Sequence, residues 1–173
     1  MALIKKVRNM TPSFGENCYL ADNATVIGDV AMGDNCSLWF NTVVRGDVNS
    51  IRIGNKVNIQ DGAVLHCSYQ KSVIEIGDNV SIGHNVIIHG AKIYPNVLIG
   101  MGVTLMDHVV VGENSIIAAG ALVLRNTEIE ANSIYAGVPA KFVKTVDPEQ
   151  TKDMINRIAD NYLMYADWYR QDS

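Results

Sequence analysis

The sequence predicts an all-β fold, a parallel β-helix of about six triangular coils with one C-terminal α-helix packed on the outside. Three features predict it: a pair of apolar positions recurs every six residues, a turn cluster follows most pairs, and a helical pattern begins after the last repeat. A six-residue period fits no single amphipathic helix, but it fits short strands joined by turns. Three such sides close one coil, and successive coils stack at strand spacing, about 4.8 Å.

The repeat unit is a small or branched residue followed two positions later by an aliphatic one. Upstream pairs such as Ala24/Val26 precede a longer step across GDVNS, and the pairs then run from Ile51/Ile53 to Ser133/Tyr135 with an interruption at CSYQKS. Clusters such as Gly77-Asp78-Asn79 provide the turns between pairs. Eighteen hexads over roughly residues 15–140 therefore predict about six coils, with the aliphatic side chains inside.

Residues 147–170 predict the α-helix. Asp147 before Pro148 is typical of an N-cap followed by a first-turn proline, and Glu149 suits the positive end of the helix dipole. Apolar and aromatic residues then recur at helical spacing: Ile155, Ile158, Ala159, Tyr162, Tyr165, Ala166 and Tyr169. We expect this face to pack against the outside of the prism, with its aromatic residues serving packing.

Length and composition narrow the class of protein. A chain of 173 residues favours one domain, taken here as residues 1–173, and a net charge of -4 argues against nucleic-acid binding. The sequence lacks the roughly 18 consecutive apolar residues of a membrane span and the apolar core of a signal peptide, so a cytoplasmic address is expected. Cys18, Cys36 and Cys67 include no CxxC pair, which indicates reduced thiols.

The register of the repeat brings two histidines together. Four aliphatic residues, Val44, Leu65, Ile88 and Leu105, fall on the same side of successive coils. The residues directly after them therefore form a ladder that points outward: Arg45, His66, His89 and Met106. At about 4.8 Å between strands, the imidazoles of His66 and His89 can converge on one metal ion.

His84 lies one corner away from this pair, because the same count stacks Asp61 over His84. A single chain would have difficulty bringing all three rings together, whereas a cyclic trimer can place His84 of one subunit beside the His66/His89 face of the next. Each interface would then contain one site formed by three histidines, with an open coordination position for water. The alternative is an accidental stack of exposed histidines. His108 does not fit the pattern and is expected at the surface.

The segments around these residues resemble the gamma-class carbonic anhydrases, which are hexapeptide-repeat proteins of the left-handed parallel β-helix type. NTVVRGDVNSIRIG, NIQDGAVLH and GHNVIIHG carry RGD, QD, a histidine and HNxxxH in the family's order. The left hand of the coil is taken from this resemblance. So is the implied activity, the reversible hydration of CO2 to bicarbonate by a metal-bound hydroxide at subunit interfaces of a homotrimer.

The resemblance also assigns roles to individual residues. The implied zinc ligands are His66, His84 and His89, with His84 given across the interface; Fe2+ and Co2+ are alternative metals. Gln60 is implied to hydrogen-bond the metal-bound water. The charged residues Arg45, Asp47 and Asp61 are implied to form an interfacial salt-bridge network, with a further role for Arg45 in positioning bicarbonate. A purely structural role for these three charges is an equal alternative, since buried charges must be paired.

The sequence differs from the most active family members at the residues that would carry the released proton away from the site. Val48 follows RGD where those members carry a glutamate, and CSYQKS after His66 lacks their acidic loop. Tyr69, Cys67 and buffer itself are weak substitutes. Tyr162 and Asn161 of the C-terminal helix are within possible reach of the site, but we expect both to serve packing. Weak or latent activity is therefore expected.

Two other classes stay open. One is a hexapeptide-repeat acyltransferase or thioesterase-like protein acting on acyl-CoA, since GVPAK at 137–141 resembles the segment that ends many such domains. The other is a non-catalytic metal-binding or assembly protein.

Overall fold

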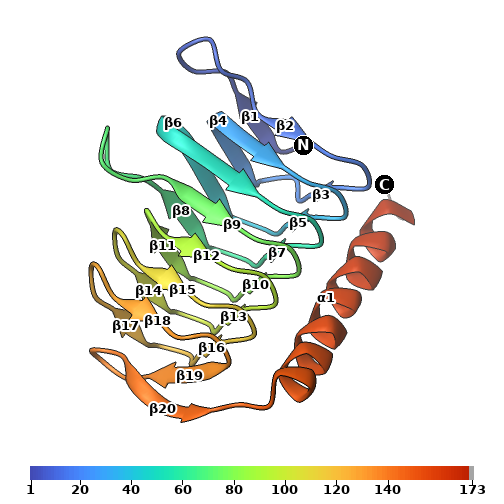
Figure 1. Ribbon diagram of the computed structural model, residues 1–173. Coiled ribbons are helices and arrows are strands. Elements are labelled where there is room, and N and C mark those ends of the chain that lie inside the picture. Colours follow the sequence, from blue (N-terminus) through green and yellow to red (C-terminus); the bar gives the residue numbers. More distant parts are fainter. Residues whose placement is uncertain (172–173) are drawn as a thin grey trace.

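The computed structural model describes residues 1–171, which form a parallel β-solenoid with one long helix beside it (Figure 1). The predicted fold class is confirmed. Each of the three faces of the prism contains seven parallel strands, so the coil makes about seven turns rather than the six expected. Residues 172–173, which the predicted domain includes, lie outside the described residues.

Two faces, here called face A and face B, belong to one continuous sheet, because β4 (Thr25–Met32) and β6 (Val43–Ile53) run around the corner between them. The first halves of β4 and β6 lie on face A and their second halves on face B. The other strands of face A are β1 (Leu3–Lys5), β8 (Val64–His66), β11 (Ile87–His89), β14 (Thr104–Leu105) and β17 (Leu122–Val123). Those of face B are β2 (Ser13–Phe14), β9 (Ile74–Ile76), β12 (Lys92–Ile93), β15 (Val110–Val111) and β18 (Glu128–Ile129).

The third face, face C, is a separate sheet that ends in one antiparallel strand. Its parallel strands are β3 (Tyr19–Leu20), β5 (Ser37–Leu38), β7 (Asn58–Ile59), β10 (Ser81–Ile82), β13 (Leu98–Ile99), β16 (Ile116–Ile117) and β19 (Ser133–Ala136). Strand β20 (Lys141–Thr145) pairs antiparallel with β19 and leads into helix α1 (Pro148–Gln171). It thereby covers the free edge of face C at the last coil.

The turn beyond the six expected is the first one, which consists of β1, β2 and β3. Its strands are separated by a loop in which Val7 and Met10 form an isolated antiparallel bridge, so this coil lacks the six-residue spacing. Strand β1 is exposed, and its pairing is provided by β4. The first coil therefore depends on backbone pairing with its neighbour more than on a local sequence pattern.

Left-handed backbone conformations make the corners of the coil. Asparagines occupy many of these positions, among them Asn35, Asn79, Asn85 and Asn114, each with φ between 55° and 57°. Asparagine tolerates this region better than most side chains. Stacked asparagines also bond to each other, as Asn79 does to Asn96 at 2.8 Å. Asparagine thus suits the left-handed corners that turn the chain from one face to the next.

The outward surfaces of the three faces differ. Face B presents charges that stack in register, with Glu75 paired to both Arg52 and Lys92. Face C is covered by α1, which contacts β5 and β10 and whose Asn156 accepts a hydrogen bond from Asn79 at 2.7 Å (Figure 1). Face A presents apolar side chains, of which Val64 and Ile87 are 36% and 45% exposed. Face A is therefore the apolar face that α1 leaves uncovered.

Helix α1 begins where the sequence predicts. Asp147 Oδ1 accepts hydrogen bonds from the backbone amides of Glu149 at 2.9 Å and Gln150 at 3.3 Å, which is the N-cap interaction. Of the expected packing face, Ile155, Ala159 and Ala166 are buried. Among residues 1–171, no helix combines the length and the apolar character needed to span a bilayer.

Candidate metal centre

The predicted histidine ladder lies on face A. Arg45 pairs in register with His66, and His66 with His89, on three successive coils. The ring centroids of His66 and His89 are 5.5 Å apart. The two imidazoles thus meet on the outer surface because one residue follows the buried Leu65 and the other the buried Ile88.

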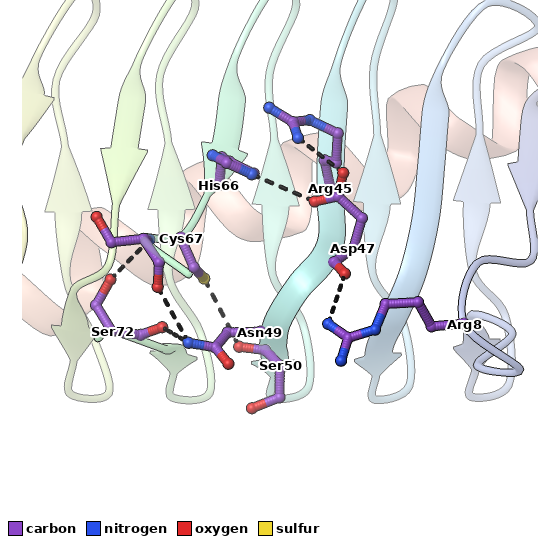
Figure 2. Close-up of polar contacts among 9 residues, drawn as sticks. Arg8, Arg45, Asp47, Asn49, Ser50, His66, Cys67 and Ser72 are labelled. Atoms are coloured by element: carbon purple, nitrogen blue, oxygen red, sulfur yellow. Dashed lines mark hydrogen bonds and ion pairs between the residues drawn. The ribbon is translucent and has the colours of Figure 1, made fainter. Parts of the chain in front are cut away.

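Asp47 links the ladder to Arg45. Its Oδ2 accepts from Arg45 Nη1 at 2.8 Å, its Oδ1 lies 3.3 Å from His66 Nε2, and its carbonyl accepts from Arg8 (Figure 2). Burial acts to raise the pKa of Asp47, but the hydrogen bond and charge of Arg45, together with His66, hold it below its ordinary value. Burial and the charge of Arg45 also lower the pKa of His66. His66 is therefore neutral near pH 7, the form in which imidazole binds metals.

His84 lies at the corner between faces C and A, as predicted, and its Nδ1 is 2.9 Å from Asp61 Oδ2. The neighbouring Gln60 is 6% exposed, and its Nε2 donates to Asn58 Oδ1 at 2.9 Å. Asn58 in turn donates to Ser81 Oγ at 2.7 Å. This chain of bonds fixes the Gln60 amide and leaves its Oε1 as the acceptor end. Asp61 thus pairs with His84 within the chain, while Arg45 pairs with Asp47.

An open hollow of about 430 Å³ borders Gln60 and His84. The rest of its lining is apolar side chains and small residues, among them Leu98, Met101 and Ile158 of α1. The hollow therefore combines one fixed amide and one imidazole with an apolar wall.

Asp107 is a contact of His89 that the sequence did not point out. Its side chain is 7% exposed, and its Oδ1 lies 3.2 Å from His89 Nδ1. Burial acts to raise the pKa of Asp107, but hydrogen bonds from Ser72 and Ser68 and the interaction with His89 keep it below its ordinary value. Register gives only part of the signal: it stacks the corner that carries Asp107 on Gly90, where the backbone amide of His108 donates to the Gly90 carbonyl at 2.7 Å. It does not give the side-chain contact with His89. His108 itself is exposed, as expected.

The candidate proton-transfer residues are not well suited to that task. Val48 packs partly buried against the core, and Cys67 is buried. Burial, together with the nearby charge of Asp61, raises the pKa of Tyr162 to about 12, and its ring packs edge-on against Trp39 at 5.3 Å. Tyr162 therefore stays protonated at neutral pH and serves packing. Tyr69 is exposed beneath the guanidinium of Arg8.

The three histidines do not complete a metal site within one chain. No group of three or more His, Cys, Asp or Glu side chains converges on a single point anywhere in residues 1–171. The donor set nevertheless suits zinc, because three imidazoles, each beside a carboxylate, are a common ligand set for it. His66 and His89 lie together on face A, and His84 lies apart from them at the corner.

Comparison with known proteins places the chain in a family. Residues 11–46 and 90–125 match the family model described as bacterial transferase hexapeptide (six repeats). The protein named carbonic anhydrase in Geobacillus kaustophilus is 40% identical over 168 residues, which cover 97% of this chain and 91% of that protein. The chain belongs to the gamma carbonic anhydrase-like family of hexapeptide-repeat proteins.

Two further members of this family show the breadth of the names it carries. The protein named gamma carbonic anhydrase 2, mitochondrial, of Arabidopsis thaliana is 37% identical over 94% of this chain, which spans only 60% of that protein. A hexapeptide transferase family protein from Anaplasma phagocytophilum has a solved structure that is 36% identical, with a TM-score of 0.89 and coverage of 96% of this chain and 98% of that one.

Proposed function

We propose that the protein is a metal-dependent carbonic anhydrase-like enzyme that hydrates CO2 reversibly at the subunit interfaces of a homotrimer. The observation that carries the proposal is the division of the donor set: His66 and His89 stack on face A, while His84 lies at the neighbouring corner with its own carboxylate. Two of the relatives, from Geobacillus kaustophilus and Arabidopsis thaliana, carry names that state this activity.

Face A supports the trimer. It is the apolar face that α1 leaves open, and the outward side chains Val64 and Ile87 flank the ladder positions of His66 and His89. When a copy of the chain packs its corner against this face, the apolar side chains are buried and His84 of that copy approaches the pair. Because the contact joins two different surfaces, its repetition closes a ring when a three-fold rotation relates the copies, which is the arrangement proposed here. Three copies give three equivalent sites.

The proposed metal is zinc, held by His66 and His89 of one subunit and His84 of the next, with Fe2+ and Co2+ as alternatives. A zinc ion held by three imidazoles with one open coordination position would supply hydroxide at neutral pH, since such an ion lowers the pKa of a bound water to about 7. Gln60, fixed by Asn58, presents Oε1 to orient a water molecule. The apolar hollow beside it admits CO2, which is uncharged.

The charged residues bind the product and hold the site together. Arg45 keeps its guanidinium at the ladder through Asp47, where it can bind bicarbonate. Asp61 orients His84 at the edge that faces the neighbouring subunit. Solvent and buffer must accept the released proton, because position 48 is a valine and the segment after His66 contains no acidic side chain. This chemistry predicts slow turnover.

The test is stoichiometry. Sedimentation of the purified protein, combined with metal analysis of the same sample, should give a trimer with about one divalent ion per chain. A stable monomer that is free of metal even after incubation with zinc would remove the proposal. The same preparation can be assayed with acyl-CoA, and turnover there without bound metal would favour the acyltransferase alternative.

A further inference from the structure

We propose that Asp107 is a positioning residue for the metal ligand His89: its carboxylate accepts the Nδ1 proton and so presents Nε2 to the metal. The inference rests on the function proposed above. It assigns a role to a buried carboxylate, to the two serines that donate to it and to the loop that carries those serines.

The hydrogen bonds around Asp107 define which atom carries each proton. Ser72 Oγ accepts from the backbone amide of Ser68 at 3.0 Å, and its own proton goes to Asp107 Oδ1 at 2.6 Å. Ser68 Oγ donates to Asp107 Oδ2 at 3.1 Å. An ionised carboxylate can only accept, so a hydrogen bond across the 3.2 Å between Oδ1 and His89 Nδ1 needs the proton on Nδ1. The lone pair of His89 is then on Nε2.

Asp107 is held more firmly than the carboxylates beside the other two histidines. The side chain of Asp107 is 7% exposed, against 25% for Asp47 and 41% for Asp61. Arg125 Nη2 supplies a fourth contact, 3.3 Å from Oδ2. Four contacts on two oxygens leave the carboxylate little freedom to rotate, so His89 meets a fixed acceptor.

Gly90 makes this arrangement possible. A Cβ at position 90 would lie 2.2 Å from Ser72 Oγ and 2.5 Å from Asp107 Oδ1, and the backbone there has a φ of 69°. The lack of space for a Cβ and the positive φ at position 90 thus both favour glycine. The residue next to the ligand His89 has no side chain, and Asp107 and Ser72 occupy the space it leaves.

The loop that supplies the serines begins directly after the other ligand of the same chain, His66. Asn49 holds this loop closed, because its Nδ2 donates to the carbonyls of Ser68 at 3.1 Å and Ser72 at 2.8 Å (Figure 2). The short segment CSYQKS lacks an acidic shuttle, but it furnishes the two hydroxyls that orient Asp107. Through them, the segment after His66 sets the orientation of His89.

The test measures the proton position directly, in the full-length chain freed of metal by chelation. Histidines labelled with ¹⁵N report the protonated ring nitrogen by NMR, and the four signals can be assigned by single His→Gln substitutions. Wild-type His89 should carry its proton on Nδ1. In Asp107→Asn, whose amide can present either an oxygen or an NH2 group, a population with the proton on Nε2 should emerge.

Zinc affinity provides the second readout. Asp107→Asn should weaken binding by about 10- to 100-fold in competition with a chelator, which is the usual effect of removing a hydrogen-bond partner of a ligand. Asp78→Asn is the matched control, because Asp78 is also a corner carboxylate, accepts from the Asn55 amide at 2.6 Å, and lies at a corner without a histidine. Its affinity for zinc should not change.

The outcomes separate the two proposals. A wild-type His89 with its proton on Nε2, in a protein that binds zinc tightly, would overturn the positioning role and leave the proposed function intact. If the His89 proton lies on Nδ1 and depends on Asp107, but the protein takes up no metal, the hydrogen bond between Asp107 and His89 is supported and the proposed function is overturned. An unchanged proton position together with an unchanged zinc affinity in Asp107→Asn would also overturn the positioning role. If that variant fails to fold, the spectrum of the wild-type protein decides the question.

Discussion

Substitution of Gly90 by alanine tests how tightly the structure is built around the candidate site. Gly90 has a φ of 69°, and a Cβ there would lie within 2.5 Å of both Ser72 and Asp107. Gly120 is a matched control, because its φ is 70° and no atom lies within 4 Å of the Cβ position. Both substitutions place alanine at the same left-handed φ, so their backbone strain energy is the same. Only Gly90→Ala displaces neighbouring side chains.

The expected difference follows from the contacts. A left-handed alanine costs about 1–2 kcal/mol, and the smaller conformational freedom of the unfolded chain returns about 0.4–1 kcal/mol. Gly120→Ala should therefore destabilise the protein by about 1 kcal/mol. Gly90→Ala must also displace Ser72 Oγ and so break its hydrogen bond to the Asp107 carboxylate, a bond worth about 1.5–3 kcal/mol. Its total cost should be about 3–4 kcal/mol.

Thermal unfolding of metal-free samples at one protein concentration measures this difference, since bound metal and oligomerisation both shift Tm. For a chain of this length, 1 kcal/mol corresponds to about 2–4 °C. Gly90→Ala should therefore unfold at least about 4 °C below Gly120→Ala. Equal Tm values for the two variants would refute the reasoning, because they would mean that Ser72 and Asp107 move aside at no cost.

Two further predictions concern the helix and the reaction. Asp147→Ala removes the acceptor of the Glu149 and Gln150 amides and should cost about 1 kcal/mol. Urea unfolding measures this cost against Asp153→Ala, which removes an exposed carboxylate in the second turn of α1, and equal stabilities would show that the cap contributes nothing. CO2 hydration, measured by stopped flow on zinc-loaded protein, should be slow and should rise with buffer concentration, because no acidic side chain near Val48 carries the proton away. Fast turnover independent of buffer would show that a shuttle residue exists.

The register of the site could be predicted from the sequence because a parallel coil with a six-residue period converts spacing into position. Residues that follow Val44, Leu65 and Ile88 must lie above one another on the outside, and the pairing of Arg45, His66 and His89 confirms this. The same count placed Asp61 beside His84. Backbone pairing alone determines these neighbours, so no knowledge of side-chain conformation was needed.

Asp107 could not be predicted in the same way. Its contact with His89 crosses from a corner to a face, and it depends on the missing side chain of Gly90 and on the closed conformation of the segment Cys67–Ser72. The first coil was missed for a related reason, since β1 pairs with β4 through its backbone and shows no repeat of its own. Long-range contacts of irregular segments are not encoded in a local period.

Subunit mixing tests the central claim, a metal site shared between chains. His84→Ala keeps the His66/His89 pair but offers nothing to its neighbour, whereas His66→Ala keeps His84 and loses its own pair. Each variant alone should bind metal poorly. Unfolding the two variants together and refolding them should restore part of the metal content, because some interfaces then combine an intact pair with an intact His84.

Simple mixing of the two folded variants is the control and should restore nothing while the trimers do not exchange subunits. The metal content of the co-refolded sample, compared with the average of its two parents, is the deciding measurement. The account predicts a clear excess of metal over that average. A metal content equal to the average would show that His84 does not act across an interface, and would contradict the account.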